Sequence, residues 1–267
     1  MSAFLIHMLF SKIILYSFTI SYNYKSEHFA DFNRFEWVFS SRSSLVKFML
    51  IQIDYLCKTK YYMKDDIQYI ISGKSQVKHH HLIQAACSYL KGSQGTSAMA
   101  KDQQQLKEEE TKSLIQFAEE NKLWVENINI DLYVSQGAEQ KVYLKDGSTV
   151  LKLNDAIYYA SWVDYFHNLL LNNLFFPDTA YQLLGFHKDL DVLYAVVEQP
   201  FVKANEKTDL NMVKAFLENN GFINKKNHDY YNEELNLILE DLHDENVLTQ
   251  NGMLYFIDTV FYIVSPK

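Results

Sequence analysis

Hydrophobic positions follow a helical period through the middle of the chain and a strand-like pattern after it. Between residues 66 and 124, apolar residues recur at spacings of three and four, and Gly92-Ser93-Gln94-Gly95 separates two such runs. From Asn129 onward the apolar runs are short, and turn residues divide them. The pattern predicts a helical segment over 66–124 and a mixed region over 125–267, so the expected fold class is α+β.

The mixed region predicts a definite order of elements. Three strands come first, a helix follows, and two strands come next, with Asp146-Gly147 as a hairpin turn between the second and third strands. This order makes a five-stranded sheet with one helix against it. A second helix and two more strands complete the chain. The strands are expected at 128–134, 141–144, 149–153, 181–187, 192–197, 237–239 and 253–257, and the helices at 156–174 and 210–219.

Residues 1–65 differ from the rest of the chain. They form an apolar, aromatic-rich extension that contains no Gly or Pro, and residues 1–64 hold eight Lys or Arg against four Asp or Glu. Residues 3–20 are mostly apolar, but Lys12 near their middle makes a membrane-spanning helix costly. A secretion signal requires positive charge before its apolar run, and no Lys or Arg precedes Lys12. A helical extension, a membrane-associated helix, a signal peptide and an over-long reading frame that truly starts at Met49 or Met63 all stay open.

Composition excludes several classes of protein. The chain has 267 residues, 48% of them hydrophobic, and a formal net charge of −8, which argues against binding nucleic acid through phosphate neutralisation. Its two cysteines, Cys57 and Cys87, form no CxxC pair, which argues against a structural zinc site and for a reducing compartment. We therefore expect a cytoplasmic protein, with membrane attachment through residues 3–20 as the alternative.

Two short motifs in the helical segment carry little functional weight. Ser72-Gly73-Lys74-Ser75 resembles the end of a phosphate-binding P-loop, but position 68, where that loop needs a glycine, is Gln68. The triplet His79-His80-His81 could bind a metal ion, yet adjacent residues on a helix point in different directions. We expect the triplet to be a solvated polar patch.

The turn between the first two expected strands carries part of a nucleotide-binding pattern. The run from Ser135 to Val142 matches the kinase pattern G-x-G-x-x-G-x-V at Gly137 and Val142, with Ser and Gln at the outer positions. A plain hairpin turn explains the same residues. Ten residues later Lys152 lies inside an apolar strand, where a buried charge must be paired. The phosphates of a nucleotide are the expected partner, and snorkelling to the strand edge is the alternative.

The strongest signal lies near the C-terminus. Asp241 and Asn246 are five residues apart, and Asp258 ends an apolar strand that follows the Asn251-Gly252 hairpin turn. The kinase catalytic loop spaces its Asp and Asn in this way and is followed by a metal-binding Asp. One carboxylate would receive or orient the proton of the attacking hydroxyl, while an amide and a second carboxylate would hold magnesium. An acidic solvated loop followed by a turn is the alternative.

Together these stretches resemble the serine/threonine/tyrosine kinase-like domain found in polyvalent proteins of bacterial mobile elements, and more distantly the aminoglycoside phosphotransferases. The resemblance implies a kinase-like domain over 125–267, with the five-stranded sheet and helix as its amino-terminal lobe, a hinge near 198–201 and a minimal, truncated carboxyl-terminal lobe. It implies ATP and Mg²⁺ as cofactors and an acceptor hydroxyl on a protein or a small molecule. The matching stretches are Gly137–Tyr143, Val150–Asn154, Glu198–Val202 and Leu239–Asn246.

The resemblance also implies a role for each candidate residue. Asp241 would be the catalytic aspartate, and Asn246 and Asp258 would hold the metal ion. The nucleotide would be bound by Gly137, Val142, Lys152, Glu198 and Phe201.

Four departures from the family pattern leave other functions open. Pro200 has no N–H where a hinge donor is expected, so either the register shifts to Phe201 or adenine is held differently. Leu239 replaces the usual His before the catalytic Asp, and the helix after Lys152 offers Asp164 in place of a Glu. Only nine residues follow Asp258, so the helices that dock a peptide substrate are expected to be absent. A nucleotide-binding pseudokinase and a non-catalytic interaction module remain alternatives.

Overall fold

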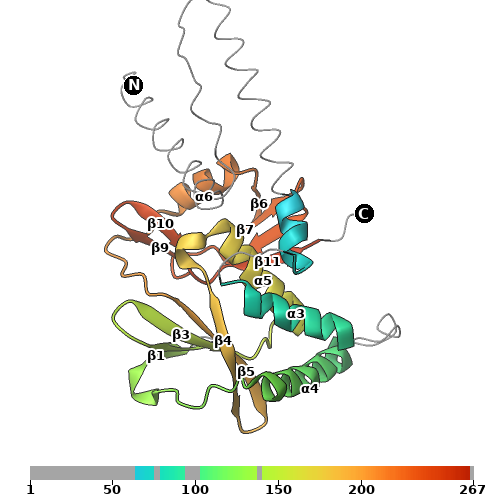
Figure 1. Ribbon diagram of the computed structural model, residues 1–267. Coiled ribbons are helices and arrows are strands. Elements are labelled where there is room, and N and C mark those ends of the chain that lie inside the picture. Colours follow the sequence, from blue (N-terminus) through green and yellow to red (C-terminus); the bar gives the residue numbers. More distant parts are fainter. Residues whose placement is uncertain (1–63, 75–78, 94–102, 137–139, 265–267) are drawn as a thin grey trace, which may run out of the picture. The chain divides into compact units, whose positions relative to one another are not determined.

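The computed structural model describes residues 64–74, 79–93, 103–136 and 140–264, which all belong to one compact unit, Tyr62–Lys267 (Figure 1). The predictions for residues 3–20 lie outside the described residues, and so does Gly137. Within the described part of the chain, no helix has the length and apolar character that crossing a membrane requires.

The predicted five-stranded sheet is present, and every neighbouring pair of its strands is antiparallel. Its spatial order is β1-β2-β3-β5-β4. The turn at Asp146-Gly147 joins β2 to β3, and the Asp146 carboxylate stabilises it by accepting hydrogen bonds from the backbone N–H and the hydroxyl of Ser148. The strands are β1 (Tyr133–Gln136), β2 (Gln140–Leu144), β3 (Thr149–Asn154), β4 (Gln182–Asp189) and β5 (Val192–Pro200).

Helix α5 (Trp162–Phe175) connects β3 to β4 and starts later than the predicted residue 156. The Asn154 side chain accepts a hydrogen bond from the backbone of Ala156, whose φ of 57° is left-handed, and such a turn cannot continue into a helix. The helix instead begins at the cap Ser161, whose hydroxyl accepts from the N–H of Asp164.

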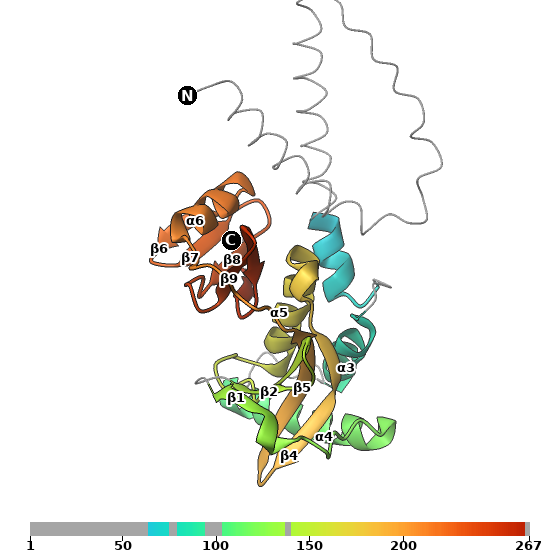
Figure 2. The same cartoon turned by 90° about the vertical axis from the view of Figure 1, so that its left-hand side faces the viewer.

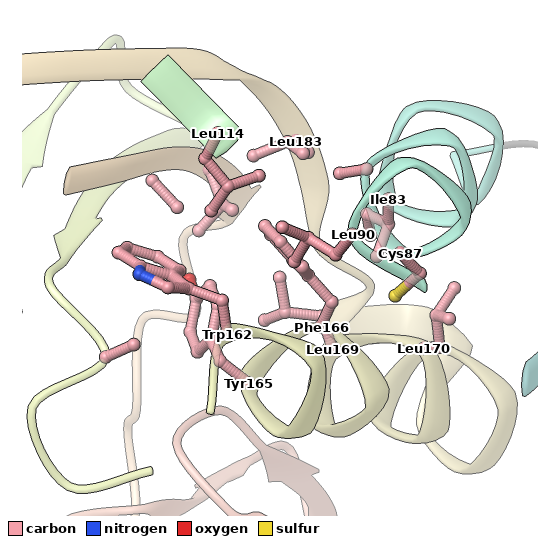
Figure 3. Close-up of a cluster of buried hydrophobic side chains, with 14 of the residues drawn as sticks. Ile83, Cys87, Leu90, Leu114, Trp162, Tyr165, Phe166, Leu169, Leu170 and Leu183 are labelled. Atoms are coloured by element: carbon pink, nitrogen blue, oxygen red, sulfur yellow. The ribbon is translucent and has the colours of Figure 1, made fainter. Parts of the chain in front are cut away.

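Helices α3 (His81–Ser93) and α4 (Gln103–Asn121) confirm the prediction of helices in this part of the chain and share one hydrophobic core with α5 and the sheet. Their buried residues lie on one face of each helix, as the apolar spacing predicts. Figure 3 shows this core, including Ile83, Cys87, Leu90, Leu114, Trp162, Tyr165, Phe166, Leu169, Leu170 and Leu183.

The C-terminal part of the unit contains one helix and six short strands, gathered away from β1 and β2 in both Figure 1 and Figure 2. Strands β11-β8-β7-β6 form a four-stranded sheet, and β9 and β10 form a hairpin at the predicted Asn251-Gly252 turn. The elements are α6 (Leu210–Asn219), β6 (Ile223–Lys226), β7 (Asp229–Asn232), β8 (Leu237–Glu240), β9 (Val247–Gln250), β10 (Met253–Phe256) and β11 (Val260–Ile263).

Only β8 and β10 of these strands follow from the sequence pattern. Strands β6 and β7 have polar sequences, Ile-Asn-Lys-Lys and Asp-Tyr-Tyr-Asn, and a turn at Asn227, with a left-handed φ of 49°, joins them. Their pairing to β8 comes from tertiary contacts, which override weak local preference for a strand.

The described residues of the two short motifs, 72–74 and 79–81, serve the local helices, and Ser75 lies outside the described residues. Gly73, at a φ of 75°, ends the helix over 64–71, and the N–H of Lys74 bonds back to the Tyr69 carbonyl at 3.0 Å, as in a Schellman cap. The prediction of a solvated histidine patch is wrong for His80, which directly precedes α3 and is 1% exposed. Burial lowers the pKa of His80 to about 4, with a smaller contribution from His79.

Glu110 on α4 secures the start of α5, which generates a prediction for stability. Its buried carboxylate accepts a hydrogen bond of 2.6 Å from the backbone N–H of Trp162, at the positive end of the helix dipole. Substitution Glu110→Ala leaves that N–H buried without this acceptor, so we expect unfolding to cost about 1–3 kcal/mol less. Urea unfolding measures the change. Exposed Glu108→Ala is the matched control, and equal losses in the two variants would contradict the assignment.

The buried His80 generates a second prediction, for acid stability. Its folded-state pKa is lowered to about 4 from 6.5, so between these values the unfolded chain binds a proton that the folded chain refuses. The free energy of unfolding therefore decreases as the pH falls from about 6.5 to 4, by about 1.4 kcal/mol per pH unit for one site. In urea unfolding across pH 4–7, we expect His80→Gln to remove this contribution, so that the slope falls by about 1.4 kcal/mol per pH unit. His81→Gln, at an exposed position, should keep the wild-type slope.

Candidate active site

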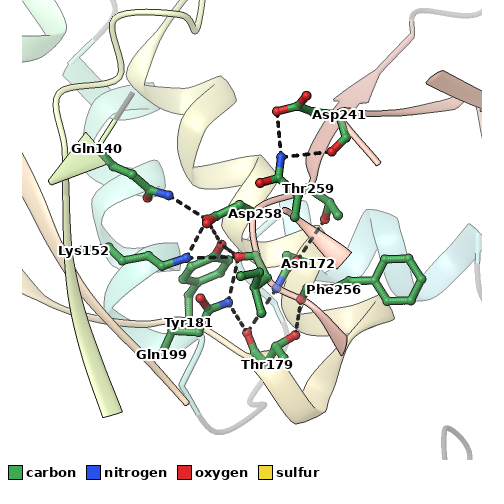
Figure 4. A network of polar contacts seen from close by, with 12 residues as sticks. Gln140, Lys152, Asn172, Thr179, Tyr181, Gln199, Asp241, Phe256, Asp258 and Thr259 are labelled. Atoms are coloured by element: carbon green, nitrogen blue, oxygen red, sulfur yellow. Dashed lines mark hydrogen bonds and ion pairs between the residues drawn. The ribbon is translucent and has the colours of Figure 1, made fainter. Parts of the chain in front are cut away.

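Lys152 lies on the buried face of the five-stranded sheet. It occupies the middle of β3, directly opposite Val142 on β2 and Val197 on β5, and it is 3% exposed. Its ammonium donates to Asp258 Oδ1 at 2.5 Å and to the Ile257 carbonyl at 3.2 Å (Figure 4). The sequence predicts that this buried charge is paired. Its partner within the protein is the carboxylate of Asp258, the predicted metal ligand.

Asp258 lies in the turn between β10 and β11, and hydrogen bonds to its two neighbours, Ile257 and Thr259, hold that turn in place. The Ile257 carbonyl accepts from Lys152, from the hydroxyl of Tyr181 and from the side-chain amide of Gln199. The Thr259 hydroxyl donates to Asn172 on α5 at 3.3 Å. Hydrogen bonds between these residues and β3, β5 and α5 therefore fix the backbone position of Asp258.

The two carboxylate oxygens of Asp258 have different surroundings. Oδ1 accepts from Lys152 and, at 2.7 Å, from the side-chain amide of Gln140 on β2. The Tyr181 oxygen lies 3.3 Å away, but its single proton goes to the closer Ile257 carbonyl. Oδ2 has no hydrogen-bond partner among the described residues, and the side chain is 24% exposed. Oδ1 is therefore held by two donors, whereas Oδ2 is not held by the described residues.

Asp241, His243 and Asn246 contact one another in the loop between β8 and β9. The Asn246 amide donates to the Asp241 carbonyl at 3.0 Å and to its Oδ2 at 2.8 Å. Both acceptors demand N–H groups, which fixes the orientation of the amide and leaves Asn246 Oδ1 without a partner in the described part of the chain. The His243 Nε2 lies 3.1 Å from Asp241 Oδ1. The five-residue spacing thus closes a compact loop.

This loop also touches the Asp258 turn. The N–H of Ile257 donates to the Asn246 carbonyl at 2.9 Å, so the predicted metal ligands Asn246 and Asp258 belong to two backbone segments that are hydrogen-bonded to each other. In Figure 4, Asp241 lies apart from the Lys152–Asp258 pair, and no contact is drawn between Asp241 and either residue of the pair. Asp241 has a left-handed φ of 66°, an uncommon conformation that Asp adopts more readily than most residues.

The predicted hinge residues have partners within the protein. Glu198 forms an ion pair with Lys145 across the sheet. The backbone N–H of Phe201, which the hinge hypothesis assigns to the nucleotide, donates instead to the Ser148 carbonyl at 2.7 Å. Val142 on β2 pairs with Lys152 on β3. The binding roles of these three residues stay predictions.

The suggestion that Asp164 replaces the helix glutamate does not hold. Its carboxylate accepts from the Ser161 hydroxyl at 2.7 Å, at the start of α5, so it serves the helix cap. Lys152 takes its counter-charge from Asp258 instead. Close to this pair lies a cavity of about 20 Å³, room for about one water molecule, which Tyr165 and Asn168 of α5 help to line. Burial, followed by the charge of Asp258, raises the pKa of Tyr165, so its hydroxyl stays neutral.

Sequence reasoning missed two residues of the site. It treated Gln140 only as a departure from a glycine pattern, although residues two apart on a strand share a face, and Gln140 lies two before Val142. That parity is the signal that could have found it. Tyr181 precedes β4 and is placed by two hydrogen bonds with Asn173, for which the sequence offers no local signal.

Metal-ligand candidates are few in this site. Among the described residues, no three His, Cys, Asp or Glu side chains gather as a ready metal cage. Magnesium in nucleotide sites uses one or two carboxylates together with substrate phosphates, so Asp258 Oδ2 and Asn246 Oδ1 fit as a partial ligand set.

Comparison with known proteins identifies one family. A family model described as "Serine/Threonine/Tyrosine Kinase found in polyvalent proteins" matches residues 107–265, which is more than half of the chain. No curated protein and no solved structure gives a significant match. The match includes every element from β1 to β11 and most of α4.

The unequal burial of Lys152 and Asp258 predicts unequal effects of removing either one. The Lys152 side chain is 4% exposed and that of Asp258 is 24% exposed. We expect Asp258→Ala, which strands a buried ammonium, to lower the free energy of unfolding by about 3 kcal/mol, and Lys152→Met to lower it by about 1 kcal/mol. The double variant should resemble Lys152→Met alone. Chemical denaturation of all four proteins gives the coupling energy, and additive losses would contradict a direct pair.

Proposed function

Because the chain belongs to the family of serine/threonine/tyrosine kinases found in polyvalent proteins, we propose that it transfers the γ-phosphate of ATP to a hydroxyl group with the help of Mg²⁺. The observation that carries this proposal is the meeting of Lys152 with Asp258, next to the loop that holds Asp241 and Asn246. Phosphate transfer needs a cation for the phosphates, oxygen ligands for a metal ion and a carboxylate for the acceptor hydroxyl.

Lys152 is the phosphate-binding group in this proposal. An ammonium has three N–H donors, and its contacts to Asp258 and Ile257 use two of them. In this proposal the third donor goes to a phosphate oxygen, and the ion pair stays intact. A buried lysine is well suited to this task because a charge–charge contact is stronger where water is scarce.

Asp258 and Asn246 would hold the metal ion through the two oxygens that have no protein partner in the described structure. When bound, Mg²⁺ supplies positive charge that neutralises the transferring phosphoryl group. Lys152 and Gln140 keep the Asp258 carboxylate in place through its other oxygen. The chain itself therefore contributes a prearranged anion and a neutral amide oxygen.

Asp241 would accept or orient the proton of the attacking hydroxyl. Its carboxylate is hydrogen-bonded to Asn246 and lies within 3.1 Å of His243, which limits its rotation, while its side chain remains 49% exposed. An acceptor can thus approach it from solvent. The acceptor itself, whether a protein hydroxyl or a small molecule, stays open.

A pseudokinase that binds nucleotide without transferring phosphate is the second candidate. The observation that favours it is Gln140, which stands at the last glycine position of the kinase pattern and extends its side chain to Asp258. A side chain at that position reduces the room that glycine leaves for close approach of the backbone to phosphates.

Asp241 and Asp244 provide a matched pair for testing phosphate transfer. We expect wild-type protein to gain thermal stability with Mg²⁺ and ATP, and to release ADP or label itself with γ-phosphate. Asp241→Asn should keep the stability gain, because the proposal assigns Asp241 to the acceptor hydroxyl and not to the nucleotide, and lose at least about 100-fold in transfer rate. Asp244→Asn, the same change three residues away, should retain transfer.

Two other outcomes would decide against the proposal. Equal transfer by Asp241→Asn and wild type would remove Asp241 from the mechanism. The wild type could also gain stability with Mg²⁺ and ATP and yet transfer no phosphate, either to itself or to added basic proteins. That result would favour the pseudokinase.

A further inference from the structure

Gln140 makes a hydrogen bond to a residue far away in the sequence. It is the first residue of β2, directly opposite Asn154 on β3, and is partly buried. Its side chain crosses from the sheet to a residue 118 positions later in the chain, where Nε2 donates to Asp258 Oδ1 at 2.7 Å. A carboxylate only accepts hydrogen bonds, so the amide must present its nitrogen, and its orientation follows from chemistry.

The second donor changes what the Asp258 carboxylate can do. A single bond from Lys152 lets the carboxylate rotate about its Cβ–Cγ bond, because terminal carboxylate torsions are soft. A donor from a different strand, aimed at the same oxygen, restricts that torsion and leaves Oδ2 clear of both donors. Gln140 is neutral, so it orients the carboxylate and leaves its negative charge available to a cation.

We propose that Gln140 is a positioning residue that holds Asp258 Oδ2 ready for a divalent cation. The proposal rests on the proposed function and adds a residue to it. Gln140 acts through Asp258 and does not itself ligate the ion. Outer groups that fix a metal ligand in this way typically change metal affinity by about 10–100-fold when they are removed.

A purely structural role for Gln140 has different consequences. If the bond only ties β2 to the Asp258 turn, its loss weakens nucleotide binding equally with and without metal. If it only closes the site against ligands, its loss tightens nucleotide binding. A positioning role changes the metal requirement and leaves metal-free binding as it was.

The test measures binding of a fluorescent ATP analogue to the full chain, once in EDTA and once during titration with Mg²⁺ or Mn²⁺. Gln140→Met keeps the length of the side chain and removes the donor. We expect its affinity in EDTA to stay within about twofold of wild type, and the metal concentration for half-maximal enhancement to rise about 10–100-fold. Exposed Gln116→Met is the control for the same chemical change and should match wild type.

Gln140→Asn provides a second variant should the Met variant unfold. It keeps the amide but shortens its reach by one methylene, so we expect a weakened metal response of the same sign. Thermal unfolding in EDTA reports whether each variant is folded.

Each remaining outcome decides the matter. A metal requirement equal to that of wild type overturns the positioning role and leaves the proposed function intact. Parallel loss of binding with and without metal, or tighter binding, overturns it as well. Wild-type protein that shows no metal-enhanced binding at all overturns the proposed function, and the role of Gln140 with it.

Discussion

The buried ion pair between Lys152 and Asp258 is the contact on which the geometry of the site depends. An ammonium inside a sheet is costly unless an anion meets it, so a strand that carries Lys152 obliges the fold to bring a carboxylate to that face. The carboxylate comes from 106 residues later in the chain. This requirement links the five-stranded sheet to the C-terminal hairpin, and the remaining contacts of the site keep the two aligned.

The Ile257 peptide carries that alignment to the rest of the site. Its carbonyl accepts from groups on β3 and β5 and from Tyr181, and its N–H donates to the Asn246 carbonyl. The residue just before Asp258 therefore sets the position of two neighbours at once, the carboxylate on one side and the Asp241–Asn246 loop on the other. The backbone places the loop, and the side chains within it determine how Asp241 and Asn246 face each other.

The parts of this arrangement that the sequence predicts are those encoded over a few residues. The five-residue spacing of Asp241 and Asn246 closes one loop, and Lys152 stands out because a charge interrupts an apolar strand. The pairing of β6 with β7 and the inward position of His80 depend on contacts between distant segments, which no local pattern contains. Gln140 combines local and distant information. The face of β2 on which it lies follows from strand alternation, whereas its partner Asp258 cannot be read from the local sequence.

Helix α5 supports the site through neutral side chains, because its one acidic residue, Asp164, serves the helix cap. Its Asn168 accepts from the N–H of Phe261, and its Asn172 accepts from the Thr259 hydroxyl, so the helix fixes the segment that carries Asp258 from behind. A glutamate on this helix, aimed at Lys152, would set two carboxylates against one ammonium in a poorly solvated place and leave one of them uncompensated. Neutral amides avoid that conflict. They transmit the position of the helix to the Asp258 carboxylate while the ion pair keeps its balance of charge.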